Sequence, residues 1–377
     1  MNSMKILHLM SNLPDHRVEK AAYLLKKEGH EIYFAGYVPK DYKPPTYDSK
    51  LFTQTFNVEI SPRNKLGIDL NSIIAELTKI CDEQNIDVIH ASNIYCANIA
   101  DKLNRPVVFD DREFYSYELQ YISARKTDLK NRLAHILMKK RYPRMEKQII
   151  KKWPIVTVSK EIIELYKKID PDIRGYYFPN MPLLEEVQEF EPKAKQNKKL
   201  LTMYVGLNDF SNPISYRNTA GLVELWNTNE IGELVIIGDK NYSNSKNVTN
   251  LGFIKQKEVF RQLLKGHVGL IGWIPHTYHH ICSLNKIFNY IHTGLEPVYP
   301  QTLTIGKEIS ELYQEKLGEK FGFEFKNFSE IKDYLLNNMV TLLNRDSTKI
   351  NKIARENFVL NIFKDNLINA YKEAIEN

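Results

Sequence analysis

The stretch PHTYHHICSLNKIFNYIHTGLEPVYP, residues Pro275 to Pro300, decides the fold of this chain. It contains apolar residues at positions i, i+3, i+4 and i+7 of a predicted helix, namely Leu284, Ile287, Phe288 and Ile291. Two segments flank this predicted helix, His267 to Ile274 before it and Leu295 to Tyr299 after it. Both are apolar enough for parallel strands covered on both faces. This order predicts a βαβ unit, whose ligands bind beyond the carboxyl ends of the strands.

The first turn of this helix is suited to an anion. Ser283 is the predicted N-cap, and Gly294 the residue just past the C-terminus. Lys286 lies where free backbone N–H groups and the positive end of the helix dipole attract negative charge. The other polar residues share the face away from the apolar stripe: Asn285, Asn289 and His292. The segment is either a phosphate site or an ordinary amphipathic helix whose polar face meets water, and the helix pattern alone favours the second.

The composition is typical of a globular α/β protein. With 377 residues, 43% of them hydrophobic and 26% charged, the chain is long enough for two domains. Cys81, Cys96 and Cys282 are far apart, which argues against a disulfide framework and a structural zinc site. No apolar run approaches the roughly 18 residues of a membrane span, and MNSMKILHLM is too short for a signal peptide. We expect a cytoplasmic protein, either free or peripheral at the inner face of the cell membrane.

One segment carries most of the positive charge. The net charge is +6, and Arg125 to Lys152 holds eleven Lys or Arg residues against Asp128 and Glu146. The predicted apolar stripe of this helix is Leu129, Leu133, Ile136 and Leu137. Such a helix either binds an anionic membrane or a nucleic-acid backbone, or presents a solvated basic face. Nucleic acid is the less expected partner, because few aromatic residues are available for base stacking.

The segment SLNKIFNYIHTGLEPVY resembles the "PNK-L/I-FEYM-x-x-G-L-P-V" motif of family-4-type glycosyltransferases. The resemblance implies the α/β GT-B fold, in which two Rossmann-like parallel-sheet domains face each other across a cleft and the C-terminal helix crosses back to the first domain. It also implies retaining sugar transfer from a nucleoside-diphosphate sugar. The expected parts are an acceptor-side domain 1–184 joined by the helix at about 360–377, a linker 185–199, and a donor-binding domain 200–359.

Three segments of the first half resemble the same family. SNLPDHRV resembles "S-x-x-x-x-D-x-R-V", HASN resembles "H-A-H-D", and FDDREFY resembles "Y-D-A-H-E" with Arg112 where the family commonly has His. The resemblance places Asp15, Arg17 and Asn93 on the acceptor side. It makes Asp110, Arg112 and Glu113 the catalytic candidates.

These residues also have other interpretations. Asp15 is equally suited to cap the following helix and form a first-turn salt bridge. Arg112 either clamps an acidic or phosphorylated acceptor or pairs with Asp111 or Glu113. The turn after the first strand, Met4 to Met10, carries no G-x-G-x-x-G, which argues against a dehydrogenase.

The second half contains the segments expected to hold the donor. LLTMYVG resembles the family's "YVG-R-L", although Leu207 replaces the Arg, and Arg217, at the start of a predicted helix to Trp226, takes the place of the second basic residue. NLGFIKQKEVF resembles the segment whose backbone meets the nucleobase, and Asn289 replaces a Glu that commonly binds the ribose. The resemblance implies the following donor-binding residues: Gly206, Arg217, Gly252, Phe253, Ile254, Ser283, Leu284, Asn285, Lys286 and Asn289.

Three histidines suggest a metal site, but the expectation is that none is present. His276, His279 and His280 lie within five positions of a loop, yet a matching set of carboxylates or thiolates is absent. Charge compensation by Arg217, Lys286 and helix dipoles needs no metal. We therefore expect no cofactor and a UDP- or GDP-sugar as co-substrate.

Three functions follow, in descending order of expectation. The first is an active transferase that acts on a glycan or lipid-linked acceptor in surface glycan and polysaccharide biosynthesis. The second is a catalytically silent relative that serves as a binding or chaperone subunit, since Leu207, Arg112 and Asn289 depart from the family pattern. The third is a nucleic-acid-modifying transferase, which would bind DNA or RNA in a strongly salt-dependent way.

Overall fold

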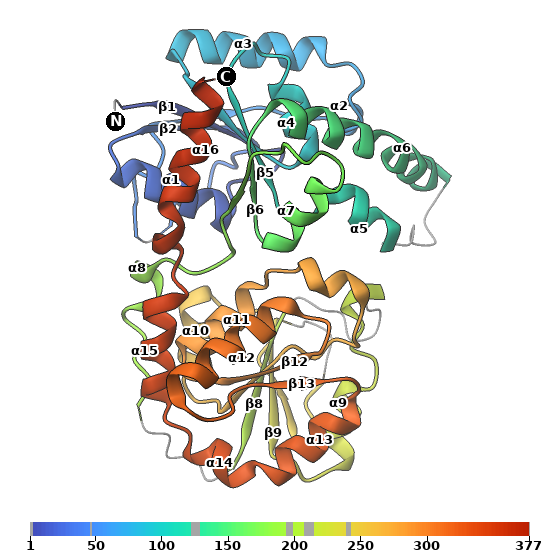
Figure 1. Cartoon of the computed structure of the whole chain (residues 1–377), viewed down its shortest axis with the longest axis vertical. Coiled ribbons are helices and arrows are strands. Elements are labelled where there is room, and N and C mark those ends of the chain that lie inside the picture. The colour runs from blue at the N-terminus through green and yellow to red at the C-terminus, as the bar shows by residue number, and fades with distance from the viewer. Residues whose placement is uncertain are drawn as a thin grey trace. The chain divides into compact units, whose positions relative to one another are not determined.

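The computed structural model describes residues 3–45, 47–121, 129–193, 199–206, 215–238 and 243–376 (Figure 1). Its contacts divide the chain into two compact units, Met1–Asn180 with Leu360–Asn377, and Met181–Val359. Among the helices within these ranges, none combines the length and the apolar character needed to cross a bilayer.

The first unit is built on seven parallel strands in the order β3-β2-β1-β4-β5-β6-β7. The strands are β1 (Lys5–Leu9), β2 (Glu31–Gly36), β3 (Gln54–Asn57), β4 (Val88–Ser92), β5 (Val107–Asp111), β6 (Ile155–Thr157) and β7 (Gly175–Tyr177). Every residue of β4 and β5 is buried, as expected for parallel strands covered on both faces. The strand order reverses between β1 and β4, which is where ligands of such sheets bind.

Helices cover this sheet, and the last of them comes from the end of the chain. They are α1 (His16–Lys27), α2 (Pro62–Lys65), α3 (Asn71–Gln84), α4 (Ile94–Ala100), α5 (Tyr115–Tyr121), α6 (Leu129–Lys152), α7 (Lys160–Lys167), η3 (Leu360–Phe363) and α16 (Lys364–Glu376). Helix α16 packs against α1 and strands β4 to β7, and its Tyr371 is fully buried (Figure 1). The prediction that the final helix returns to the first domain is therefore confirmed.

The second unit repeats the same topology with six parallel strands in the order β10-β9-β8-β11-β12-β13. The strands are β8 (Leu201–Val205), β9 (Glu233–Ile237), β10 (Val248–Asn250), β11 (Val268–Leu270), β12 (Glu296–Pro300) and β13 (Phe323–Phe325). The helices are α8 (Leu184–Val187), η1 (Ser215–Arg217), α9 (Leu222–Thr228), α10 (Gln256–Leu263), η2 (Thr277–Ile281), α11 (Asn285–His292), α12 (Thr304–Leu317), α13 (Phe328–Asn337), α14 (Met339–Asn344) and α15 (Ser347–Asn357). The switch point of this sheet lies between β8 and β11.

The βαβ unit predicted from Pro275 to Pro300 is present, because α11 connects the neighbouring parallel strands β11 and β12. Its apolar residues Ile287, Phe288 and Ile291 are fully buried, and Gly294 follows the helix with φ +74° as predicted. The predicted cap is wrong, since the N-cap is Leu284, which offers no side-chain hydrogen bond. The polar face is also buried in large part: the His292 Nε2 lies 3.0 Å from the Phe358 carbonyl oxygen.

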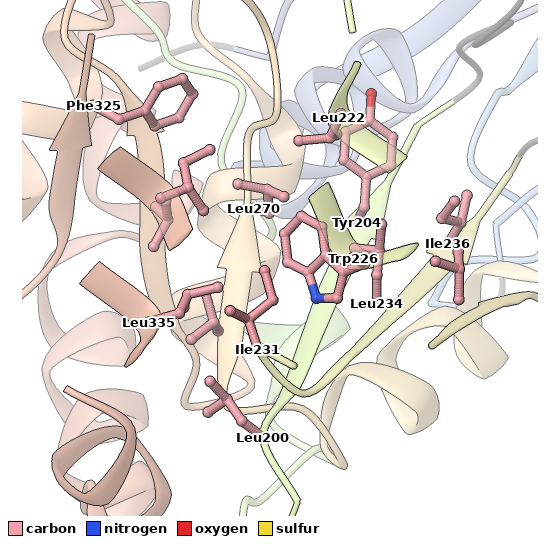
Figure 2. Close-up of a cluster of buried hydrophobic side chains, with 14 of the residues drawn as sticks. Leu200, Tyr204, Leu222, Trp226, Ile231, Leu234, Ile236, Leu270, Phe325 and Leu335 are labelled. Atoms are coloured by element: carbon pink, nitrogen blue, oxygen red, sulfur yellow. The ribbon is translucent and has the colours of Figure 1, made fainter. Parts of the chain in front are cut away.

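The core of the second unit gathers around Trp226 of α9, which is completely buried. Figure 2 shows its indole among Leu222, Tyr204 and Leu270 over the strands. Helix α9 begins only at Leu222, after Gly221 with φ +84°, so the predicted helix from Arg217 is too long at its start. Arg217 instead ends the short helix η1.

The first part of the predicted linker belongs to the second unit. Val187 of α8 and the following Phe190 form a buried cluster with Phe260 and Val359. The rings of Phe190 and Phe260 stack with their centroids 4.8 Å apart. Burial of these apolar side chains holds residues 187–190 against the second unit, so this part of the predicted linker is packed and is not a flexible linker.

Tyr290 of α11 ties strands β8 and β11 together at the switch point. Its hydroxyl accepts a hydrogen bond from the Val205 N–H at 3.0 Å and donates one to the Leu270 carbonyl at 3.1 Å. Its ring covers Gly269, where an added Cβ would lie 2.2 Å from the ring.

Tyr290→Phe should lower the free energy of unfolding by about 1–3 kcal/mol, because two backbone groups at this buried position lose their partner. Urea unfolding measures the loss. Tyr299→Phe is the control, since its hydroxyl meets only the adaptable Ser310 hydroxyl at 2.7 Å. A loss for Tyr290→Phe no larger than for the control would contradict the prediction.

Candidate functional site

A buried lysine occupies the switch point of the second sheet. Lys286, in the first turn of α11, is only 9% exposed. Its Nζ lies 4.7 Å from the ring centroid of Tyr204 and 4.4 Å from that of Trp273. The same Nζ is 3.4 Å from where a Cβ on Gly206 would stand. The ammonium group is therefore held between two aromatic rings beside the backbone that follows β8.

Arg217 brings a second cation to the same place. Its guanidinium carbon lies 5.8 Å from the Trp273 ring centroid and 5.1 Å from that of Tyr216. Burial, and then the charge of Arg217, lower the pKa of Lys286 to about 7. Among the residues described by the structure, no carboxylate opposes this shift. Two cations over one indole, with no acid acting on Lys286 among the described residues, make a site that favours an anion of high charge.

Backbone turns at three glycines form the floor of this site. The Gly206 N–H donates to the Ile237 carbonyl at 2.9 Å, and the Gly238 N–H donates to the Gly252 carbonyl at 2.7 Å. Gly238 has φ +108°, and a Cβ there would stand 2.6 Å from the Gly206 oxygen. Only glycine fits at position 238, so the ends of β8 and β9 approach closely. Gly238 was missed from the sequence, although it directly follows the apolar strand ELVII.

The other predicted donor residues differ in burial. Phe253, just after Gly252, is 65% exposed, and Ile254 is half-buried. Asn289 lies one helical turn after Lys286 and is buried, whereas Asn285 is exposed. Leu207 lies outside the described residues. Ser283, Leu284 and Asn285 precede Lys286 at the start of α11, where no side chain caps the helix.

The sequence did not identify the two aromatic walls of the site. Tyr204 is the last residue but one of the apolar strand LTMYV, and Trp273 follows β11 in the run LIGWI. Both read as ordinary core residues in the sequence. Their position at the carboxyl ends of neighbouring strands is the signal that would have found them.

The three histidines of the following loop organise its backbone. His279 is fully buried, with Nε2 bonded to the Tyr216 carbonyl and Nδ1 3.1 Å from the Thr302 hydroxyl. Burial lowers the pKa of His279 to about 4, so the ring is neutral at physiological pH. The His276 Nδ1 accepts the Tyr278 N–H at 3.0 Å. Within the described ranges, no group of three or more His, Cys, Asp or Glu side chains is arranged for a metal ion.

The first unit has its own polar cluster at the carboxyl ends of β1, β4 and β5, centred on Asp110. The Arg17 Nε and Nη2 atoms donate to its carboxylate at 2.9 and 2.8 Å, and the Arg112 Nε donates at 3.2 Å. His90 Nε2 lies 3.4 Å away. Burial alone would raise the pKa of Asp110, but the charges of Arg17 and Arg112 hold it well below its usual range. Asp110, 1% exposed, therefore positions the arginines and is poorly suited to exchange protons with a substrate.

Arg112 pairs with Asp110 and Asp15, so the predicted partners Asp111 and Glu113 are wrong. Its Nη2 also donates to the Ser92 hydroxyl at 3.1 Å. Two carboxylates balance this guanidinium, which removes the reason to expect an acidic acceptor here.

Asp15 has the two structural roles that the sequence suggested, with one change. It caps α1 by accepting the N–H groups of Arg17 and Val18 at 3.1 and 3.0 Å. Its ion pair reaches across to Arg112 instead of staying within the first turn. Arg17 also donates from Nη1 to the Phe178 carbonyl at 2.7 Å. The structure thus brings Asp15, Arg17 and Arg112 together around Asp110.

Asn93 and Glu113 lie at the margins of this cluster. Asn93 has φ +74° and caps α4, because its side chain accepts the Cys96 N–H at 3.3 Å. Glu113 is half-buried in the loop that follows Arg112. The role of Asn93 that the structure shows directly is to cap helix α4.

Two buried acids beside the cluster were not predicted. Asp111 accepts the Tyr166 hydroxyl at 2.8 Å, and Glu146 of α6 accepts the Ser116 N–H at 3.0 Å. Burial raises the pKa of Asp111 to about 7, and burial together with the charge of Asp111 raises that of Glu146 to about 8. These carboxyls hold the start of α5 against the domain, and the pKa values of the neighbouring Asp110 and Asp111 are shifted in opposite directions.

Solved structures with similar folds cover nearly the whole chain. Sucrose-phosphate synthase from Thermosynechococcus elongatus matches with a TM-score of 0.72 at 12% identity, covering 98% of each chain. HepE from Anabaena, in complex with UDP-glucose, matches with a TM-score of 0.65 at 11% identity, covering 98% of this chain and 100% of that one. The chain has the GT-B fold.

The GT-B fold by itself leaves the reaction open. An α,α-trehalose-phosphate synthase (UDP-forming) from Burkholderia vietnamiensis matches with a TM-score of 0.60 at 10% identity, covering 99% of this chain and 98% of that one. A putative UDP-N-acetylglucosamine 2-epimerase from Listeria monocytogenes matches with a TM-score of 0.55 at 11% identity, covering 100% and 97%. No family model and no curated protein matches this sequence significantly. Function must therefore be argued from the site.

Proposed function

We propose that this GT-B protein is a glycosyltransferase that uses a nucleoside-diphosphate sugar, with a UDP-sugar as the first candidate. The observation that carries the proposal is the buried Lys286 ammonium, which shares the Trp273 indole with Arg217 and has no opposing carboxylate among the described residues. A diphosphate would supply the missing negative charge. The names of the similar structures, which include complexes with UDP-glucose and with UDP and glucose, support uridine as the base.

The proposed pose follows from the site's geometry. The diphosphate lies between Lys286, Arg217 and the backbone of Gly206, with the uncapped first turn of α11 adding N–H donors. The exposed ring of Phe253 offers a surface near the base. Asn289, one turn beyond Lys286, would bond a ribose hydroxyl through its amide oxygen.

In the proposed reaction the bond between the sugar's anomeric carbon and the diphosphate oxygen breaks, and its electrons leave with the diphosphate. Lys286 and Arg217 stabilise that departing charge, which requires no metal ion. An acceptor hydroxyl then forms the new bond to the anomeric carbon and passes its proton to the departing diphosphate oxygen. We propose retention at that carbon and an acceptor that is a glycan or a lipid-linked sugar of surface polysaccharide synthesis, bound on the side of Asp15, Arg17 and Asn93.

A thermal-shift panel tests the donor site. UDP, GDP, ADP, CMP and uridine are compared, and a diphosphate at about 100 times its dissociation constant should add roughly 2.7 kcal/mol to stability. We expect UDP to stabilise the protein strongly and uridine hardly at all. Arg217→Ala should remove this effect, while Lys316→Ala, at an exposed lysine in the last turn of α12, should keep it. Absence of stabilisation by every diphosphate, with the fold intact, would overturn the proposal.

A turnover assay separates the remaining functions. Release of UDP together with a glycosylated product indicates the transferase. Conversion of one UDP-sugar into another without release of UDP would favour an epimerase. Binding without either reaction would favour the silent-subunit hypothesis. The observation that supports this hypothesis is Asn289, which replaces the Glu that commonly binds the ribose in the family.

A further inference from the structure

The outward face of α6 presents apolar and basic side chains in one line. Leu133, Ile136 and Leu137 are 53%, 51% and 41% exposed. Lys140, Arg144 and Lys147 continue the same face at helical spacings of three and four residues, and all three are exposed. We call these six residues the outer α6 face. It is apolar at one end and basic at the other.

The opposite face of α6 explains why this line points outward. Tyr142, Met145, Ile149 and Ile150 are buried, and they hold the second half of the helix along α4 (Figure 1). Glu146, the helix's one acidic residue, is buried on this inner side. The outer face therefore has no negative charge of its own.

The chemistry of the face matches one partner class best. Aliphatic side chains exposed in a contiguous group cost free energy in water, whereas they gain it in the acyl region of a lipid surface. Basic residues on the same face are attracted to anionic headgroups. A nucleic acid would use the lysines but offers nothing to three aliphatic side chains, and the face carries no aromatic ring for base stacking. A second copy would set like charges against each other.

We propose that the outer α6 face docks this protein on an anionic lipid surface. Leu133, Ile136 and Leu137 enter the boundary between headgroups and acyl chains, and Lys140, Arg144 and Lys147 contact lipid phosphates. This docking does not depend on the proposed sugar transfer. The proposed contact uses only part of the basic segment Arg125 to Lys152 that the sequence indicated. Arg141 of that segment does not take part, because it turns inward and bonds the Leu66 carbonyl.

Vesicle sedimentation with the full chain tests the docking. Wild type should bind phosphatidylglycerol-rich vesicles and not pure phosphatidylcholine vesicles. Replacing Lys140, Arg144 and Lys147 by Gln should lower partitioning about 100-fold, because each basic residue near such a surface contributes roughly fivefold. Replacing Leu133, Ile136 and Leu137 by Asn should abolish the binding that remains at high salt, where the Debye length falls to about 3 Å.

The matched control changes three exposed lysines of the second unit, Lys316, Lys349 and Lys352, to Gln. It should bind vesicles like wild type. Equal weakening by this control would show a nonspecific effect of net charge and overturn the proposal. Three other results would also overturn the proposal: absence of vesicle binding, binding of duplex DNA in its place, or a concentration-dependent dimer that dissociates in the Ile136→Asn variant. Circular dichroism confirms that each variant is folded, which is expected because all changed side chains are exposed.

Discussion

Lys286→Met should stabilise the ligand-free protein near neutral pH and, in the same variant, remove its affinity for nucleoside diphosphates. The folded pKa of Lys286 is about 7, against an ordinary value of 10.5. Between these two values the unfolded chain holds one proton more, so the stability of the wild type rises with pH. Below pH 7 the full cost of burying the charge applies, about 5 kcal/mol for a pKa that falls from 10.5 to about 7. Methionine fills the space without that cost.

The stability difference should therefore be largest at pH 6 and vanish near pH 10, as measured by urea unfolding across pH. The control Lys316→Met, at an exposed lysine, should show no such dependence. If Lys286→Met instead destabilised the protein equally at both pH values, Lys286 would serve only to pack the core, and the site around it would not bind an anion.

Binding is the second half of the same prediction. A diphosphate should restore the proton on Lys286, so nucleotide affinity should fall as pH rises above 7. Loss of one partner of a buried charge pair costs about 2–5 kcal/mol, so Lys286→Met should weaken UDP binding by at least about 30-fold. Calorimetry in two buffers of different ionisation enthalpy measures both the affinity and the proton uptake. A gain in stability together with lost binding is the signature of a residue kept for function.

Arg17→Met should destabilise the first unit by about 3–5 kcal/mol, because it leaves the buried Asp110 carboxylate with only part of its compensation. The folded pKa of Asp110 lies below its unfolded value, so its pairing contributes stability above about pH 4 that is lost as pH falls. The destabilisation should thus be full at pH 7 and shrink in acid. Hydrogen exchange of the β4 and β5 amides, together with urea unfolding, locates the loss in the first sheet.

Two comparisons sharpen this test. Arg105→Met removes a surface pair with the exposed Asp82 at 2.7 Å, against 2.8 Å for the buried pair of Arg17 and Asp110, and should cost no more than about 1 kcal/mol. Adding Asp110→Asn to Arg17→Met should restore part of the stability, since the uncompensated charge disappears. Equal costs for Arg17→Met and Arg105→Met would mean that Asp110 is hydrated in the native state, contrary to its burial.

The α/β class and most strands were predictable from the sequence. Short segments rich in β-branched and other apolar residues, such as VIHAS and ELVII, are typical of parallel strands covered on both faces. Gly294 was predictable for a similar reason, because the left-handed φ that ends α11 favours glycine. Lys286 and Arg217 were named through the family resemblance, and the structure places both over Trp273.

The charge states and the walls of the site could not be predicted in this way. Asp110 and Asp111 are adjacent in the chain, yet one lies against two arginines and the other against a tyrosine hydroxyl, so their pKa values move in opposite directions. Tyr204 and Trp273 lie 69 positions apart and meet only because β8 and β11 are neighbours.

The sequence by itself determined the periodicities: which segments are strands, which are helices, and where glycine must end them. These depend on interactions within a few residues. The tertiary structure alone decided which polar groups lose water and which partner each then finds. Burial of Lys286, inward orientation of Glu146 and outward exposure of Ile136 all follow from the packing of distant elements, and desolvation by that packing sets their chemistry.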